Sequence, residues 1–261
     1  MDQSAIETMA EQSAGVFFGR EYAVSEMSKS NRAIFLYHPG DEFGVKYIPT
    51  AENLFGFGKS LGDIKREIGI GLLVESFKHP NLCGVVDAKG AYDGVALKVR
   101  YSGKSLSSMD NSALPCAFEI LHDVCSGLVV LHQNNIVHND ISLNNVTVGA
   151  QGSALIDFGE ARRVGIDTDF PGYTVGFAAP EVVTLGDFSY ASDVYSVGKL
   201  GHYFEKQGVL STDLRSPFHA ILENSLFRST VSDAMIRPAA RQLELILSDY
   251  LASVQVVRKI A

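Results

Sequence analysis

The chain has 261 residues, of which 46% are hydrophobic and 20% charged, a composition typical of a globular protein with one large domain or two small lobes. Its formal net charge of −8 argues against nucleic acid as the main partner. It contains no apolar run long enough to span a membrane, and its first residues lack the basic region of a secretory signal, so we expect no membrane insertion. Three widely spaced cysteines form no CxxC motif, which predicts free thiols in a reducing compartment such as the cytoplasm.

The first half of the chain has the pattern of a strand-rich region. Short stretches that are apolar or alternate between apolar and polar residues, partly separated by turn signals, predict antiparallel strands. The predicted strands are Tyr22–Met27, Ala33–His38, Phe43–Ile48, Cys83–Ala88 and Val95–Tyr101.

A helix is predicted between the third and fourth of these strands, over Gly62–Phe77. Its apolar residues Ile64, Ile68 and Leu72 recur every fourth position, which places them on one face of a helix. Two internal glycines each cost ~1 kcal/mol relative to alanine, so we expect this helix to depend on packing for its stability.

The second half has helical periodicity. Ile120, Val124, Leu128 and Leu131 lie on one face of a predicted long helix, and helical patterns return from Ala191 onward. Between them, Ile136–Val148 and Ser153–Ile156 are predicted to form short strands around a loop.

The two halves together predict an α+β fold with two lobes and a ligand-binding cleft between them. The small residues Ser102 and Gly103 suggest the boundary. We therefore expect an N-terminal extension over residues 1–20, an N-lobe over 21–101 and a C-lobe over 102–261.

Four motifs follow one another in the second half. They are His138–Asn145, Asp157-Phe158-Gly159, Ala179-Pro180-Glu181 and Ser192–Gly198. Each motif alone is weak, but in this order and spacing the set resembles the catalytic-loop, DFG, APE and αF signatures of eukaryotic-type protein kinases. The resemblance covers nearly the whole chain and implies a bilobal fold that uses ATP and Mg²⁺.

The resemblance gives four residues in or near these motifs chemical roles. Asp157 and Asn145 would supply a carboxylate and a carbonyl oxygen to Mg²⁺, which prefers hard oxygen ligands. Asp140 would orient the substrate hydroxyl and accept its proton. Thr174 would form a hydrogen bond near Asp140.

Two lysines compete for the role of contacting the ATP phosphates. Val95-Ala96-Leu97-Lys98 matches the family's string better, but it follows the predicted helix instead of preceding it. Lys46 lies on the third predicted strand, before the helix, and is therefore the predicted phosphate-binding lysine. Its predicted partner is Glu67 on that helix, and Lys98 would be an ordinary strand residue.

The glycine-rich loop of the family is degenerate in this chain. Ser28, Ser30 and Ala33 would stand at its three glycine positions, which keeps some room for phosphates but loses the backbone freedom of glycine. The resemblance also assigns Gly44, Val99, Tyr101 and Thr147 to the nucleotide pocket.

The C-lobe offers further expectations from the resemblance. Asp193 would hold the backbone of the catalytic loop, and Glu181 would pair with Arg237. The short distance in sequence between Asp193 and Arg237 predicts a reduced or absent helix αG.

Two replacements in the catalytic loop bear on regulation and activity. Asn139 stands where many relatives have an arginine that binds an activating phosphate, so activity is predicted not to need phosphorylation. Two alternatives are open for Arg162 and Arg163, which follow the DFG motif: a substitute phosphate site or a solvated surface pair. Ser142 replaces a lysine near the γ-phosphate, as in some active atypical kinases.

Three functions agree with these features. The first is a serine/threonine kinase with a protein substrate and an activating protein partner, located in the cytoplasm, or in the host cytosol for a viral or delivered bacterial protein. The second is a pseudokinase scaffold, which the degenerate phosphate loop favours. The third is a small-molecule kinase of the aminoglycoside type, against which Thr174, the APE motif and Arg237 argue.

Overall fold

The structure is a computed structural model of the chain. It describes residues 33–37, 42–50, 59–91, 94–110, 116–209 and 237–260, the strand at 26–29, and single residues at 10, 12, 15, 17 and 234. Side chains are described neither for 26–29 nor for 253–260. The chain forms two compact units. Unit 1 comprises Met1–Lys78, Cys83–Tyr101 and Asp157–Gly159, and unit 2 comprises the remaining residues.

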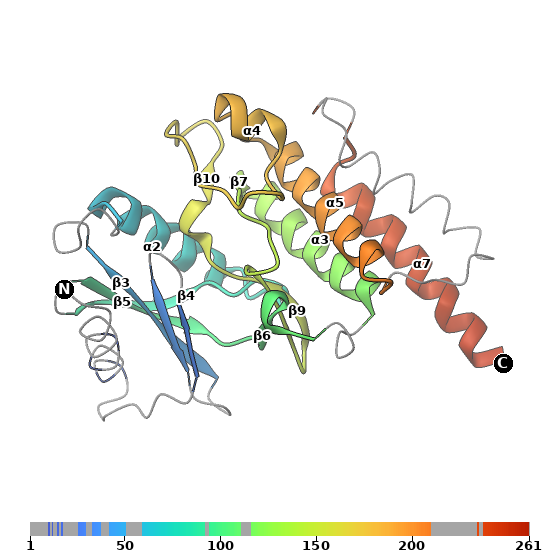
Figure 1. The fold of residues 1–261 in the computed structure, drawn as a ribbon, viewed down its shortest axis with the longest axis horizontal. Coiled ribbons are helices and arrows are strands. Elements are labelled where there is room, and N and C mark those ends of the chain that lie inside the picture. Colours follow the sequence, from blue (N-terminus) through green and yellow to red (C-terminus); the bar gives the residue numbers. More distant parts are fainter. Residues whose placement is uncertain are drawn as a thin grey trace. The chain divides into compact units, whose positions relative to one another are not determined.

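Unit 1 is built on a five-stranded antiparallel sheet in the order β1-β2-β3-β5-β4 (Figure 1). Its strands are β1 (Glu26–Lys29), β2 (Ile34–Tyr37), β3 (Phe43–Pro49), β4 (Val85–Ala91) and β5 (Gly94–Arg100). Each predicted strand is present, with its ends shifted by a few residues. Lys29 pairs with Ile34, so the connection between the first two strands is shorter than the sequence predicted.

Helix α2 (Leu61–Ser76) packs against β4 of this sheet. Ser60 caps its start by accepting a hydrogen bond from the backbone N–H of Asp63. The predicted apolar face is partly wrong, because Leu72 is 44% exposed. The buried face contains Ile64, as predicted, and also Glu67 and Gly71, which were not predicted.

The internal glycine Gly71 is required by close packing. A Cβ atom built there would lie 2.5 Å from Cγ2 of Val85 on β4. Gly84 meets the helix in the same way, since its Cβ would lie 2.3 Å from the carbonyl oxygen of Gly71. The glycine that weakens the isolated helix therefore lets the helix approach the sheet.

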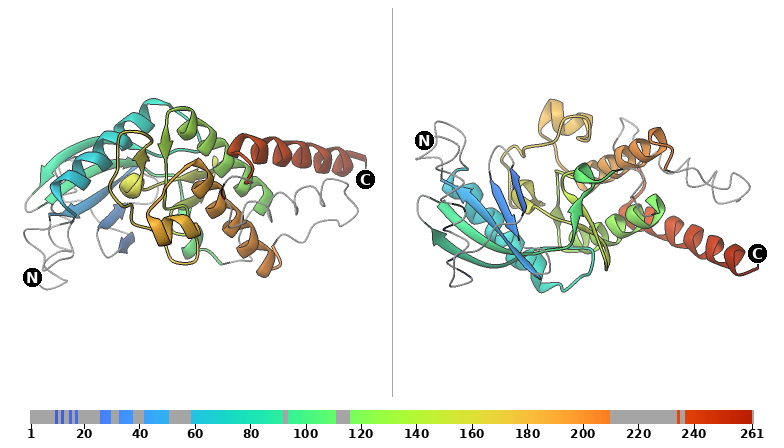
Figure 2. Two further views of the ribbon diagram at one scale, coloured as in Figure 1. Left: turned by 90° about the horizontal axis from the view of Figure 1, so that it is seen from above. Right: turned by 60° about the horizontal axis from the view of Figure 1, so that its bottom comes forward.

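Unit 2 contains four helices among its described residues, α3 (Ala117–Gln133), α4 (Pro180–Leu185), α5 (Tyr190–Lys206) and α7 (Ala240–Ile260). The predicted apolar face of α3 is confirmed, because Ile120, Val124, Leu128 and Leu131 are all fully buried. Helices α5 and α7 lie beside α3 (Figures 1 and 2). The rings of Phe118 and Tyr250 pack at a centroid distance of 4.4 Å between α3 and α7.

Short strands carry the loops of unit 2. Strands β6 (Lys104–Ser105), β8 (Val146–Gly149) and β9 (Gly152–Leu155) form one sheet, and β7 (Ile136–Val137) pairs with β10 (Arg162–Arg163). Among the described residues, 3-10 helices also cover Leu106–Ser108 in unit 2 and Phe158–Glu160, whose first two residues belong to unit 1.

The predicted α+β class, strand-rich first and helical second, is confirmed. The predicted loss of helix αG falls within residues 210–233, outside the described part of the chain. Within the described part, no helix has both the length and the apolar character needed to cross a membrane.

Candidate active site

The predicted catalytic loop of unit 2 is anchored by a buried carboxylate at the start of α5. Asp193 is fully buried, and its two oxygens accept the backbone N–H groups of His138 and Asn139, each at 2.9 Å. The Nε2 atom of His132 lies 2.9 Å from the same carboxylate. The predicted role of Asp193 in holding this loop is confirmed, and it fixes Asn139 at a φ of +66°.

Asp140 is held from two sides within this loop. Asn145 donates from Nδ2 to the backbone carbonyl and to Oδ2 of Asp140, each at 2.8 Å. Thr174 donates its hydroxyl to Oδ1 of Asp140 at 2.6 Å. The carboxylate is therefore fixed in orientation, and the amide of Asn145 is turned so that its Oδ1 oxygen remains available as an acceptor.

Ser142 lies in the same loop and is 1% exposed. Its hydroxyl finds no hydrogen-bond partner among the residues that the structure describes. A buried hydroxyl of this kind is unusual, because burying a polar group without a partner costs free energy.

Unit 1 brings together a second group of predicted residues. Lys46 on β3 places its ammonium 2.7 Å from Oε1 of Glu67 and 2.7 Å from Oδ1 of Asp157. Lys98, the alternative lysine, lies instead with its ammonium 4.2 Å from the ring centroid of Phe43. The lysine chosen by its strand position is thus the one that meets the helix glutamate.

The charged side chains that meet in unit 1 strongly shift the pKa values of Lys46 and Asp157. Burial opposes the charged form of Lys46, but Asp157 and Glu67 outweigh it and raise the pKa of the lysine. Burial likewise opposes ionisation of Asp157, but Lys46 and Lys59 outweigh it and lower the pKa of the carboxyl. Lys46 and Asp157 are therefore both charged at neutral pH.

The donor set agrees with a magnesium site of the kind that the resemblance implies. Asp157 uses Oδ1 for Lys46 and for the N–H of Gly159, at 3.1 Å, while Oδ2 accepts no hydrogen bond among the described residues. Asn145 keeps one carbonyl oxygen. Both are hard oxygens, as Mg²⁺ prefers. In the described part of the chain, no cluster of three or more His, Cys, Asp or Glu side chains could hold a metal.

The residues predicted at the glycine-loop positions are only partly described. Ser28 lies in β1 opposite Phe35, and Ser30 falls outside the described residues. Ala33 is half-buried and packs on the core beneath the sheet. Gly44 has a packing reason of its own, since a Cβ atom there would lie 2.6 Å from the ring of Phe35.

The other predicted pocket residues are ordered in their own units. In unit 1, Val99 packs against the sheet core, and Tyr101 stacks on Tyr37 at a centroid distance of 4.2 Å. In unit 2, Thr147 is buried, and its hydroxyl lies 2.5 Å from that of Ser102. No contact of these residues identifies a nucleotide, so their assignment remains a prediction.

Arg162, considered above as a phosphate receptor, is occupied within the protein. It is 1% exposed, and its guanidinium lies 2.9 Å from Asp169 and donates to the carbonyl of Phe170 at 3.3 Å. Glu160 accepts the N–H of Gly172 at 2.6 Å. A phosphate site at Arg162 is therefore contradicted, because this side chain is buried and already paired with a carboxylate. Its contacts stabilise the segment without a phosphate.

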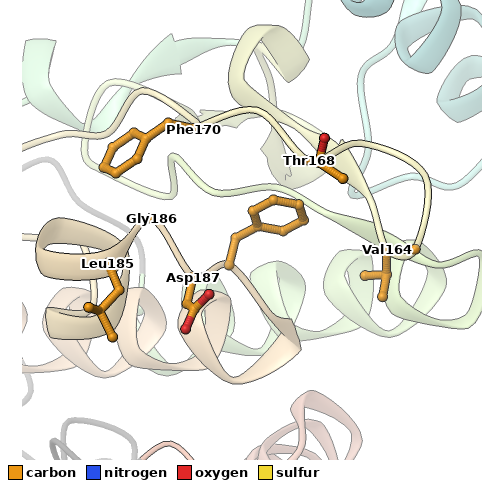
Figure 3. Close-up of a pocket in the computed structure, with 8 residues that line it drawn as sticks. Val164, Thr168, Phe170, Leu185, Gly186 and Asp187 are labelled. Carbon is orange, nitrogen blue, oxygen red and sulfur yellow. The ribbon is translucent and has the colours of Figure 1, made fainter.

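A hollow of about 380 Å³ lies beside this segment, in unit 2 (Figure 3). Val164, Thr168 and Phe170 line it together with Leu185 and Asp187 from the end of α4 (Figure 3). Three apolar side chains that line it, Val164, Phe170 and Leu185, are 40%, 55% and 72% exposed.

The predicted pair between Glu181 and Arg237 is confirmed. Both guanidinium NH groups of Arg237 donate to the carboxylate, one of them at 2.9 Å, and the arginine side chain is fully buried. This bidentate pair joins the start of α4 to the residues before α7.

One charged residue of unit 1 was missed by sequence reasoning. Lys59 is 7% exposed and donates to Oε2 of Glu67 at 2.9 Å. It stands just before the capping residue Ser60, and no periodic pattern or motif marks that position.

Comparison with known proteins bears on the family of the chain. The family model described as the protein kinase domain matches residues 37–237. Similar proteins include "Probable serine/threonine-protein kinase" of Encephalitozoon cuniculi (strain GB-M1), 29% identical over 163 residues, which are 61% of this chain and 30% of that protein.

Two plant proteins match shorter segments. An L-type lectin-domain containing receptor kinase of Oryza sativa subsp. japonica is 34% identical over 137 residues, 47% of this chain and 20% of its own. A serine/threonine-protein kinase of Arabidopsis thaliana is 36% identical over 89 residues, 33% of this chain and 15% of its own. The chain thus spans less than a third of the length of these relatives. With its family match over most of its length, the chain belongs to the protein kinase family.

Proposed function

We propose that this protein transfers the γ-phosphoryl group of ATP to serine or threonine hydroxyls of a protein substrate. The observation that carries the proposal is the fixed carboxylate of Asp140, which is held by Asn145 and Thr174 at 2.8 and 2.6 Å. A loop that was no longer used for transfer would not need to orient that carboxylate so closely.

Each group has a distinct task in this proposal. Asp140 orients the attacking hydroxyl and accepts its proton. Lys46 holds the α- and β-phosphates, and Glu67 fixes the position of its ammonium. Asp157 and Asn145 would hold Mg²⁺, which neutralises charge on the phosphate oxygens when it is bound.

The alternatives receive less support. Two of the three similar proteins are named serine/threonine-protein kinases, which favours a protein kinase. The exposed apolar side chains Val164, Phe170 and Leu185, which line one hollow, also support a protein substrate, because exposed apolar surface can take part in protein binding. A pseudokinase would account for the loss of loop glycines but not for the ordered charges around Lys46 and Asp140.

Three finer features belong to the same proposal. They are the use of Mg²⁺, an activating protein partner and a cytoplasmic location. The comparisons give none of them direct support. For the location in particular, one of the similar proteins is named a receptor kinase. Pull-down and fractionation of the tagged protein from its native cell would test the last two.

The test is transfer of labelled phosphate from ATP to proteins of a cell lysate. The wild-type protein should label lysate proteins on serine or threonine, as phosphopeptide mass spectrometry would show. Asp140→Asn should reduce labelling by ~10²-fold or more, because it removes the proton acceptor. Asp249→Asn removes an exposed carboxylate of α7 and should leave labelling unchanged. Equal labelling by wild type and Asp140→Asn would contradict the proposal.

A further inference from the structure

A second lysine shares the glutamate of the phosphate-binding lysine. The two oxygens of Glu67 are divided between two ammonium groups, with Lys46 at 2.7 Å and Lys59 at 2.9 Å. The side chains of Glu67 and Lys59 are 3% and 7% exposed. A lysine buried this deeply is uncommon unless it has a partner and a task, because burial removes its hydration.

The position of Lys59 is tied to the DFG motif within the same unit. A Cβ atom built on Gly159 would lie 2.2 Å from the ammonium of Lys59. The ammonium of Lys59 therefore lies close to Gly159, and a side chain at this position would require that ammonium to move. Because Asp157 is two residues away, the charge of Lys59 also helps to lower the pKa of that carboxyl.

A count of charges shows what Lys59 changes. Lys46 and Glu67 alone would form a neutral pair. With Lys59 bound to the same carboxylate, the three groups carry a surplus of one positive charge. Asp157 balances that surplus through its contact with Lys46. Once Asp157 serves as a metal ligand, as proposed above, the surplus remains and favours a polyanion.

We propose that Lys59 is a positioning residue for nucleotide phosphates. It acts through Glu67, whose carboxylate it also binds. Because Glu67 is shared, it neutralises the positive charge of Lys46 less, and Lys46 attracts the phosphates more strongly. Lys59 also holds Glu67 in place from the second side, which matters in a chain whose phosphate loop lacks the usual glycines. This inference rests on the proposed nucleotide binding of the previous subsection.

Affinities for ADP and adenosine, both measured by calorimetry in the presence of Mg²⁺, test the inference. Lys59→Met should weaken ADP binding roughly tenfold, the scale expected for losing one charge several ångströms away in partly buried surroundings. Adenosine affinity should stay unchanged, because adenosine carries no phosphate. A residue with a merely structural role would affect both ligands alike.

Two further variants complete the test. Lys59→Gln keeps a donor for Glu67 and is less prone to misfold, yet it should lose ADP preference like Lys59→Met. Lys65→Met removes an exposed lysine of α2, the helix that carries Glu67, with the same change in net charge, and should bind ADP like wild type. In an active preparation, KM for ATP should rise more than kcat falls for Lys59→Gln.

The outcomes separate this inference from the proposed function. Wild-type ADP affinity in Lys59→Gln, or an equal loss of ADP and adenosine affinity, would overturn the role of Lys59 while leaving nucleotide binding intact. A wild-type protein that bound neither ADP nor ATP would overturn the proposed function and this inference together.

Discussion

At the scale of single residues, the two candidate lysines differ in what their ammonium groups contact. Lys46 meets two carboxylates, whereas Lys98 lies over an aromatic ring. Lys46→Ala should therefore lower kcat/KM by roughly 10²–10³-fold, as expected when a preorganised charge at the reacting phosphates is lost. Lys98→Ala should change it by less than about threefold. Steady-state kinetics of both variants would check this, and the reverse ranking would contradict the assignment.

The lowered pKa of Asp157 predicts how stability depends on pH. A carboxyl whose pKa is lower in the folded than in the unfolded state stabilises the fold at pH values above the unfolded value of ~4, and this stabilisation is lost as the pH falls. The free energy of unfolding should therefore fall with acid more steeply in wild type than in Asp157→Asn. Urea unfolding from pH 7 to pH 3 would measure both slopes. Parallel curves for the two proteins would contradict this.

The hydroxyl of Ser142 is a polar group whose removal should cost no stability. It is buried without a hydrogen-bond partner among the described residues, so Ser142→Ala should leave the melting temperature equal or slightly higher. Thermal unfolding would check this. A loss of several degrees would show that the hydroxyl has a stabilising partner.

How far single residues could be predicted from the sequence depended on motifs. Asp140, Asn145 and Asp157 stand in strings with fixed spacing, and Lys46 followed from the order of strands. Lys59 could not be found in this way, because its burial depends on its contacts with Glu67 and Gly159, which no motif or period indicates.

At the scale of elements, the pair between Glu181 and Arg237 links the start of α4 to the chain that leads into α7. Removing one partner of a buried pair costs ~3–5 kcal/mol, because the other charge stays buried without compensation. Arg237→Ala should thus lower the melting temperature by many degrees. Arg241→Ala, at a side chain 61% exposed, is the matched control and should change little. An unchanged melting temperature for Arg237→Ala would show that the pair contributes no stability.

The segment from Asp157 to Glu181 is held by contacts that need no phosphate. Arg162 pairs with Asp169, and Asn139 donates to the carbonyl of Glu160 at 3.1 Å. After phosphatase treatment, Thr168→Ala and Tyr173→Phe should keep near wild-type turnover. Asp169→Ala should reduce turnover several-fold, because it removes the nearer of two carboxylates that pair with the buried Arg162 and leaves Glu160 at 3.8 Å. Activity that is lost in Thr168→Ala or Tyr173→Phe and restored by an acidic replacement would contradict this.

Secondary structure was predictable where one face of an element is buried and uniform. The apolar face of α3 matches its buried face, since it lies against two other helices. The face of α2 was predicted less well, because its buried surface includes Glu67 and Gly71 while Leu72 is exposed. That face is determined by ion pairs of Glu67 and by the close contact of Gly71 with the sheet. Neither produces a periodic pattern of apolar residues in the sequence.

At the scale of the whole molecule, the candidate groups divide between the two units. Lys46, Glu67 and Asp157 belong to unit 1, while Asp140, Asn145 and Thr174 belong to unit 2. Within each unit, the hydrogen bonds and ion pairs described above join members of its own group. Lys46 and Asp157, proposed to bind the nucleotide and its metal, can therefore be changed separately from Asp140, proposed to act on the substrate hydroxyl.

The separation is testable with one substitution in each unit. Asp157→Ala should abolish the Mg²⁺-dependent part of the thermal stabilisation by ATP, because it removes the carboxylate proposed to hold the metal, and a ligand stabilises a fold only as far as it binds. Asp140→Asn should keep that stabilisation, since Asp140 is proposed to act on the substrate hydroxyl, and yet lose transfer. Melting curves with ATP, with and without Mg²⁺, and transfer assays on the same samples would compare them. If Asp157→Ala were stabilised by ATP and Mg²⁺ as well as wild type, the metal assignment would be wrong, and if Asp140→Asn lost stabilisation too, the two tasks would not be separable.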